Sequence, residues 1–144
     1  MSRQPLQQWK HFLAATLVAG AAIAATTSLG GAAGAPTFAF AQLADVPSHD
    51  ERYTASLIPA AGAWTLEVRT TDGAPVEGAA LRLESWMPDD GTAAPARPRV
   101  TAALGGGRYR VEGVRLDRPG WWNVKLEVSS PATGTDSLAF NLVR

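Results

Sequence analysis

Hydrophobic and polar residues alternate along most of the chain after residue 52. In the segment 64–70, Trp64, Leu66 and Val68 fall on one side and polar residues on the other. The same period of two recurs in 79–87 and in 121–128. Successive side chains of a β-strand point to opposite faces, so this period predicts strands that bury one face and expose the other.

Turn residues divide this pattern into about seven short strands. The predicted strands cover 52–58, 64–70, 79–87, 99–104, 108–114, 121–128 and 138–142. They are separated by Asp-Gly, Gly-Gly-Gly and Pro-Gly turns and by a loop rich in Pro and Asp. The pattern predicts an all-β, immunoglobulin-like sandwich of about seven antiparallel strands, preceded by an N-terminal signal or anchor helix. The Cys-Trp-Cys spacing of antibody domains is missing, so the prediction concerns the architecture alone.

The large residues on the inward side of these strands form the predicted core. Trp64 and Trp122 are the largest of them, and the alternation turns Trp121, the neighbour of Trp122, outward. The residues expected to be buried together are Trp64, Leu66, Leu83, Tyr109, Val111, Trp122, Leu126 and Phe140.

The first 41 residues are typical of a secretory signal peptide. Arg3 and Lys10 precede the apolar stretch 12–25, and Ala39-Phe40-Ala41 fits the small-x-small cleavage rule. We therefore expect a mature start at Gln42, with Ala33-Gly34-Ala35 as a second cleavage candidate. The alternative is an uncleaved membrane anchor, although the apolar stretch is short for a span of roughly 20 residues. The predicted organisation is a leader at 1–41, a polar linker at 42–51 and one domain at 52–144.

Composition narrows the chemistry that this domain can perform. The chain has no Cys, which excludes disulfides, thiolate catalysis and Cys-ligated metals. It carries 13 basic and 13 acidic residues, and two of the basic ones lie in the leader. This balance gives no basic footprint for nucleic acid, and a membrane contact is expected only if the leader stays uncleaved.

Several short motifs in the domain resemble the YtkA-like family, which is also labelled FixH-like. They are Trp86-Met87-Pro88, Pro98-Arg99-Val100-Thr101, Gly107-Arg108-Tyr109, Val111-Glu112-Gly113 and Pro119-Gly120-Trp121-Trp122. The resemblance covers roughly 53–143. It implies a β-sandwich held in the periplasm or at the outer membrane face, in the context of copper handling and respiratory oxidases.

The residues that the resemblance associates with metal are mostly replaced. Family members commonly have Gly-His after Met-Pro, where this chain has Asp89-Asp90, and Met before Pro-Gly-Trp, where it has Arg118. A cuprous site needs several thioether or imidazole ligands, and after the leader only Met87 and His49 remain. We therefore predict no metal site and no cofactor.

No catalytic motif can be assembled either, so we predict a protein that is not an enzyme. The candidate partner surface consists of Trp86, Met87, Asp89, Asp90 and Trp121. Two outward tryptophans on a small domain indicate a surface that binds a partner. Two alternatives stay open: a bulge that turns one tryptophan into the core, and an aspartate pair that is only a solvated turn.

The sequence thus predicts an exported binding or accessory module of the bacterial periplasm, with an unidentified protein or small ligand as its partner. The first alternative is a copper-handling or oxidase-assembly factor with degenerate ligands. The second is a structural or interaction domain of the cell envelope.

Overall fold

The computed structural model describes residues 34 and 36–144, and these form ten strands in two antiparallel sheets. The seven longer strands follow the predicted alternation closely. They are β3 (Tyr53–Ile58), β4 (Trp64–Thr70), β5 (Ala80–Met87), β7 (Arg99–Gly105), β8 (Arg108–Glu112), β9 (Trp121–Ser130) and β10 (Gly134–Val143). The three others are β1 (Phe40–Gln42), β2 (Val46–Pro47) and β6 (Thr92–Ala93). The predicted N-terminal helix lies outside the described residues.

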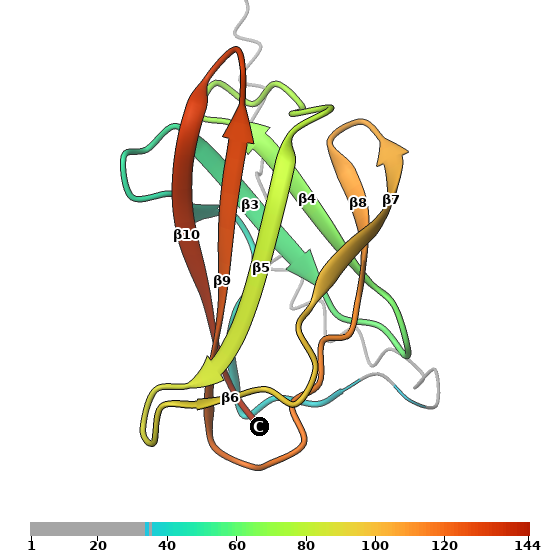
Figure 1. The fold of residues 1–144 in the computed structure, drawn as a ribbon, viewed down its shortest axis with the longest axis vertical. Coiled ribbons are helices and arrows are strands. Elements are labelled where there is room, and N and C mark those ends of the chain that lie inside the picture. The colour runs from blue at the N-terminus through green and yellow to red at the C-terminus, as the bar shows by residue number, and fades with distance from the viewer. Residues whose placement is uncertain (1–33, 35) are drawn as a thin grey trace, which may run out of the picture.

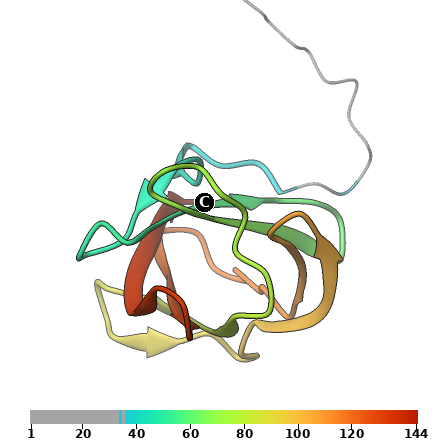
Figure 2. The ribbon, with the colours of Figure 1, turned by 90° about the horizontal axis from the view of Figure 1, so that it is seen from above.

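The two sheets face each other and enclose the core between them (Figures 1 and 2). One has the strand order β1-β10-β9-β5-β6 and the other β2-β3-β4-β8-β7. Every pairing is between antiparallel strands, and β7 carries two bulges where it pairs with β8. The prediction of an all-β protein with two antiparallel sheets is therefore confirmed. Within the described residues no helix could cross a membrane.

The core contains the large side chains that the alternation assigned to it. Trp122, Leu66, Val111, Leu126 and Phe140 are at most 1% exposed. Trp64, Leu83 and Tyr109 are buried beside them. Tyr109 also donates its hydroxyl hydrogen to the carbonyl of Val76 (2.6 Å), so the one polar atom that it brings into the core is satisfied.

The segment 42–51, predicted as a polar linker, contributes to two short strands. Gln42 belongs to β1, which pairs with β10, and Val46–Pro47 form β2, which pairs with β3. Val46 and Ser48 are buried. Both short strands lie at sheet edges, where backbone hydrogen bonds to a longer strand supply the order that the sequence pattern does not show.

Residues 38–42 also contact the sandwich. Phe38 packs edge-on against Trp64, with the ring centroids 6.1 Å apart and an interplanar angle of 71°. The Ala39 N–H donates to the carbonyl of Val143 (2.8 Å), and Phe40 to Gln42 add an edge strand to β10. The residues before the predicted cleavage point at Ala41 are thus part of the sandwich.

Candidate functional site

The loop that follows β5 and the loop that precedes β9 meet at one end of the sandwich, which is the lower end in Figure 1. Met87 ends β5 on its inward face, and residues 88–91 turn the chain back into β6. Arg118 lies in the turn before β9. The sequence motifs Met87-Pro88 and Pro119-Gly120-Trp121 are therefore neighbours in space.

Arg118 makes the contacts that join the two loops. Its Nη2 donates to the Sδ atom of Met87 (3.1 Å) and to Oδ2 of Asp90 (2.9 Å). The Met87 side chain is buried, whereas those of Arg118 and Asp90 are about half exposed. The guanidinium group therefore covers the thioether from the solvent side and is held there by a carboxylate.

The backbone around this cluster holds it in place. The indole N–H of Trp122, in the core, donates to the carbonyl of Arg118 (2.9 Å). Gly120 has a φ of +128°, and a Cβ atom there would lie 2.8 Å from Cε of Met87. The positive φ is what favours glycine here, because the methionine end that a Cβ atom would meet is flexible.

The charge of Asp90 is also stabilised locally. Hydrogen bonds from the side chain and the backbone N–H of Thr92 are the main causes that hold the pKa of Asp90 below its ordinary value, and Arg118 adds to them. The N–H of Thr92 lies 2.8 Å from Oδ1 of Asp90. The carboxylate is therefore ionised at neutral pH and stays paired with Arg118. Asp89, by contrast, is exposed and does not belong to this cluster.

This donor set does not fit a soft metal ion. Of the three converging side chains, only Met87 offers a soft donor atom, and the guanidinium of Arg118 has N–H donors and a positive charge but no lone pair for a metal. Within the described residues, no group of three or more His, Asp or Glu side chains is placed to hold a metal ion. The His49 side chain is exposed near β2, and the backbone N–H of this residue donates to the carbonyl of Ser137.

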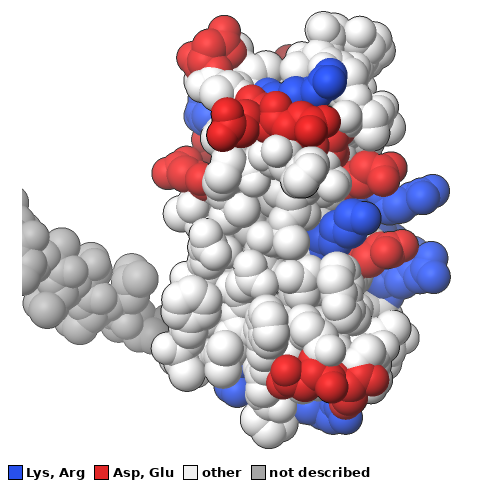
Figure 3. Space-filling model, turned by 90° about the vertical axis from the view of Figure 1, so that its left-hand side faces the viewer, with Lys and Arg blue, Asp and Glu red and all other residues white. Residues whose placement is uncertain are grey.

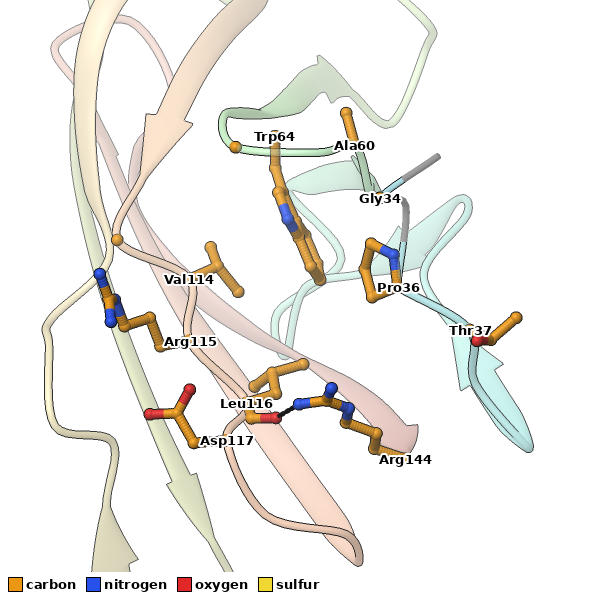
Figure 4. A pocket seen from close by; sticks show the side chains of 12 residues that line it. Gly34, Pro36, Thr37, Ala60, Trp64, Val114, Arg115, Leu116, Asp117 and Arg144 are labelled. Carbon is orange, nitrogen blue, oxygen red and sulfur yellow. Dashed lines mark hydrogen bonds between the residues drawn. The ribbon is translucent and has the colours of Figure 1, made fainter. Parts of the chain in front are cut away.

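A cleft of about 590 Å³ lies near this end but does not include Met87 or Asp90. Figure 4 shows the ring of Trp64 beside Pro36 on one wall and Val114, Arg115 and Asp117 on the other. Arg144 turns toward the carbonyl of Leu116 and donates a hydrogen bond to it. Arg115 and Asp117 lie on the same wall of the cleft.

Trp86 and Trp121 do not join the Met87 cluster. They lie on the outer face of the sheet β1-β10-β9-β5-β6. Trp121 is 43% exposed and Trp86 is partly exposed. Trp86 is paired with Asn123 across β5 and β9, and Asn123 with Asn141 across β9 and β10. The sequence analysis missed both asparagines, because nothing local to either residue shows that two amides will be adjacent.

One comparison with known proteins identifies a family for this chain. A family model described as YtkA-like matches residues 51–127, which is more than half of the chain. No curated protein and no solved structure matches the chain. The matched region contains both loops of the Met87 cluster and ends within β9. The chain therefore belongs to the YtkA-like family.

Proposed function

We propose that this protein is an exported, non-enzymatic binding module of the bacterial periplasm, built on an immunoglobulin-like sandwich. The leader-like sequence at 1–41 supports export. The family match and the two antiparallel sheets support a small β-sandwich module. In such a module the rigid sheets position side chains for recognition, and the function lies in a surface site.

One observation carries the proposal that the module acts without a metal. Arg118 stands where the family resemblance places a second methionine, and its Nη2 lies 3.1 Å from the sulfur of Met87. Asp90 stands where the resemblance places the histidine, and it pairs with the same nitrogen at 2.9 Å. At the two positions where the resemblance places soft ligands, this chain has an ion pair.

The purified mature domain is therefore expected to show no tight cuprous binding. The measurement is a competition titration against a chelator of known affinity, with cuprous and cupric ions, on the wild type and on Met87→Ala. The wild type and Met87→Ala should have the same weak affinity for copper, because the Arg118 guanidinium covers the Met87 sulfur. Tight cuprous binding that disappears in Met87→Ala would overturn the proposal and favour a copper-handling factor.

A gain-of-function variant serves as the matched control for that titration. Asp90→His combined with Arg118→Met restores the two soft ligands beside Met87 and removes the guanidinium charge. We expect this double variant to bind cuprous ion at least about tenfold more tightly than the wild type, since three soft ligands are then available. Binding by the double variant also shows that the assay would have detected a site in the wild type.

We expect export to leave β1 intact. We propose that the leader is removed after Ala35 and not after Ala41, because Phe38 and Phe40 belong to the sandwich. Intact mass of the exported protein should thus correspond to a start at Pro36. A chain that begins at Gln42 should be less stable by about 1 kcal/mol, because it loses Phe38, which is only partly buried against the core. Denaturant unfolding of the two chains measures the difference, and equal stability would contradict the structural role of 36–41.

A further inference from the structure

Four charged side chains form a square on the outer face of the sheet β1-β10-β9-β5-β6. We call them the charge quartet: Arg82 and Glu84 of β5, and Lys125 and Glu127 of β9. Arg82 is paired with Glu127 across the two strands and Glu84 with Lys125, and the four line a depression of about 140 Å³. Figure 3 shows basic and acidic side chains projecting together from one face of the molecule, at the right of the picture. The sign of the charge therefore alternates both along and across the strands.

The charge quartet is accessible to another molecule. Arg82, Glu84 and Lys125 are exposed, and Glu127 is half-buried. Among the described residues, none of the four lies within ion-pair distance of an opposite charge. The positions beside the quartet on the same face carry small side chains, namely Ala80, Ser129, Ser137 and Ala139. A flat surface can therefore approach the quartet closely and meet its charges directly.

An alternating square of charges is complementary to a second copy of itself. Two copies can face each other across a two-fold axis that runs along the strands, midway between β5 and β9. Each residue of β5 then meets, on the second copy, the residue that is its own cross-strand neighbour. Arg82 lies over Glu127 of the second copy and Glu84 lies over Lys125, and each contact occurs twice. Every charge of the quartet thus meets an opposite charge.

The outward tryptophans extend the same contact. Trp86 follows Glu84 on the outer face of β5 and is paired with Asn123 of β9, so the axis places it over Asn123 of the second copy. Trp121, which is 43% exposed, lies two residues from Asn123 along β9. Tryptophan and arginine are among the residues that most often dominate the binding energy of an interface. Sheets that pack face to face lie about 10 Å apart, a gap that these long side chains can fill.

We infer that two copies of this protein form a weak, two-fold symmetric dimer through the outer face of β5, β9 and β10. Three strands about 4.8 Å apart and about 30 Å long offer roughly 450 Å² per copy. That area is near the lower end for specific interfaces, so we expect a dissociation constant between about 10 μM and 1 mM. Nucleic acid and anionic lipid are poorer matches, because the charge quartet is neutral overall.

This inference goes beyond the proposed function, and the two can fail separately. The copper titration concerns the Met87 cluster at the end of the sandwich, whereas dimerisation concerns the outer face of one sheet. A protein that binds no copper and stays a monomer would leave the first proposal standing and remove the second.

The test is sedimentation equilibrium of the exported protein from about 10 μM to 1 mM, the range of the expected dissociation constant. Low salt is used, because dissolved ions screen exposed charges. Arg82→Glu and Glu127→Arg are measured separately. Each variant places like charges in both copies of the Arg82–Glu127 contact, so each should dimerise at least about tenfold more weakly than the wild type.

An equimolar mixture of these two variants separates contact between copies from effects within one copy. In a mixed dimer one copy carries two negative charges in this row and the other carries two positive ones, so both contacts again join opposite charges. The mixture should therefore recover the wild-type dissociation constant to within about threefold. Mixing leaves the like-charged neighbours inside each copy unchanged, so recovery can come only from the interface.

Arg110→Glu is the matched control, because Arg110 is exposed on β8 in the opposite sheet, and this variant should dimerise like the wild type. A wild type that remains a monomer at about 1 mM would overturn the inference and leave this face to a different protein. A mixture of the two variants that associates no better than either variant alone would overturn it as well.

Discussion

Replacing Trp122 by alanine should lower the free energy of unfolding by about 3–5 kcal/mol. The side chain is 1% exposed, is among the largest fully buried ones, and packs between the two sheets. Its indole N–H also satisfies the carbonyl of Arg118 (2.9 Å). The substitution therefore leaves a cavity in the core and loosens the turn that holds the Met87 cluster. Urea unfolding of the exported protein, followed by circular dichroism, measures the loss.

Trp121→Ala is the matched control for that experiment. The two tryptophans are adjacent in β9, but Trp121 points outward and is 43% exposed. Its removal should cost less than about 1 kcal/mol, as is usual for a surface substitution. If Trp121→Ala were the more damaging change, β9 would have the opposite register, because a shift of one residue exchanges the two faces of a strand.

Asp136→Asn should lower stability by about 2–3 kcal/mol at pH 7, through the loss of hydrogen bonds to a buried charge. Asp136 is 7% exposed in β10, and its carboxylate accepts the backbone N–H groups of Asp50 (3.0 Å), Arg52 (3.4 Å) and Ser137 (2.7 Å). An asparagine side chain cannot accept all of these bonds, since one of its two terminal atoms is a donor. The substitution should therefore release the turn between β2 and β3.

The same substitution predicts a dependence on pH. Burial by itself would raise the pKa of Asp136, but the Ser48 hydroxyl and the N–H groups of Ser137, Asp50 and Arg52 together hold it below the ordinary value of 3.8. A folded-state pKa below the unfolded one means that ionised Asp136 stabilises the fold above about pH 4. This contribution is lost as the pH falls through the folded-state pKa.

Unfolding of wild type and Asp136→Asn at pH 7 and pH 3 checks both expectations. The difference between the two proteins should shrink at pH 3, because the wild-type carboxyl then begins to protonate. Asp50→Asn is the control: this carboxylate is in the same turn, but its side chain is 56% exposed and lies 3.9 Å from Arg52. It should cost under about 1 kcal/mol. An Asp136→Asn penalty that is equal at both pH values would show that the carboxylate charge is not its cause.

The substitution of Arg118 for a soft ligand was visible in the sequence, but its consequence was not. The sequence shows an arginine before Pro119 and two aspartates after Pro88. Only the fold brings Arg118 to Met87 and Asp90, which are 31 and 28 residues away along the chain. The aspartate pair was interpreted as one feature, yet Asp90 pairs with Arg118 and Asp89 stays exposed.

The alternation of side chains was enough to predict the seven longer strands and the inward side of each. This was possible because a strand repeats every two residues, so a few neighbouring side chains reveal which face is buried. Core residues such as Trp64, Leu126 and Phe140 follow from that local rule. The order of the family motifs is also a property of the sequence, and the family match over 51–127 agrees with it.

The features that depend on which strands become neighbours could be seen only in the tertiary structure. β1, β2 and β6 have two or three residues each, too few for a period, and they exist because β10, β3 and β5 present backbone partners to them. The same holds for the bonds from Asp136 to a turn more than 80 residues away, and for the amide pair of Asn123 and Asn141. Such contacts join segments that are far apart along the chain, and a local hydrophobic pattern carries no information about the pairing of distant strands.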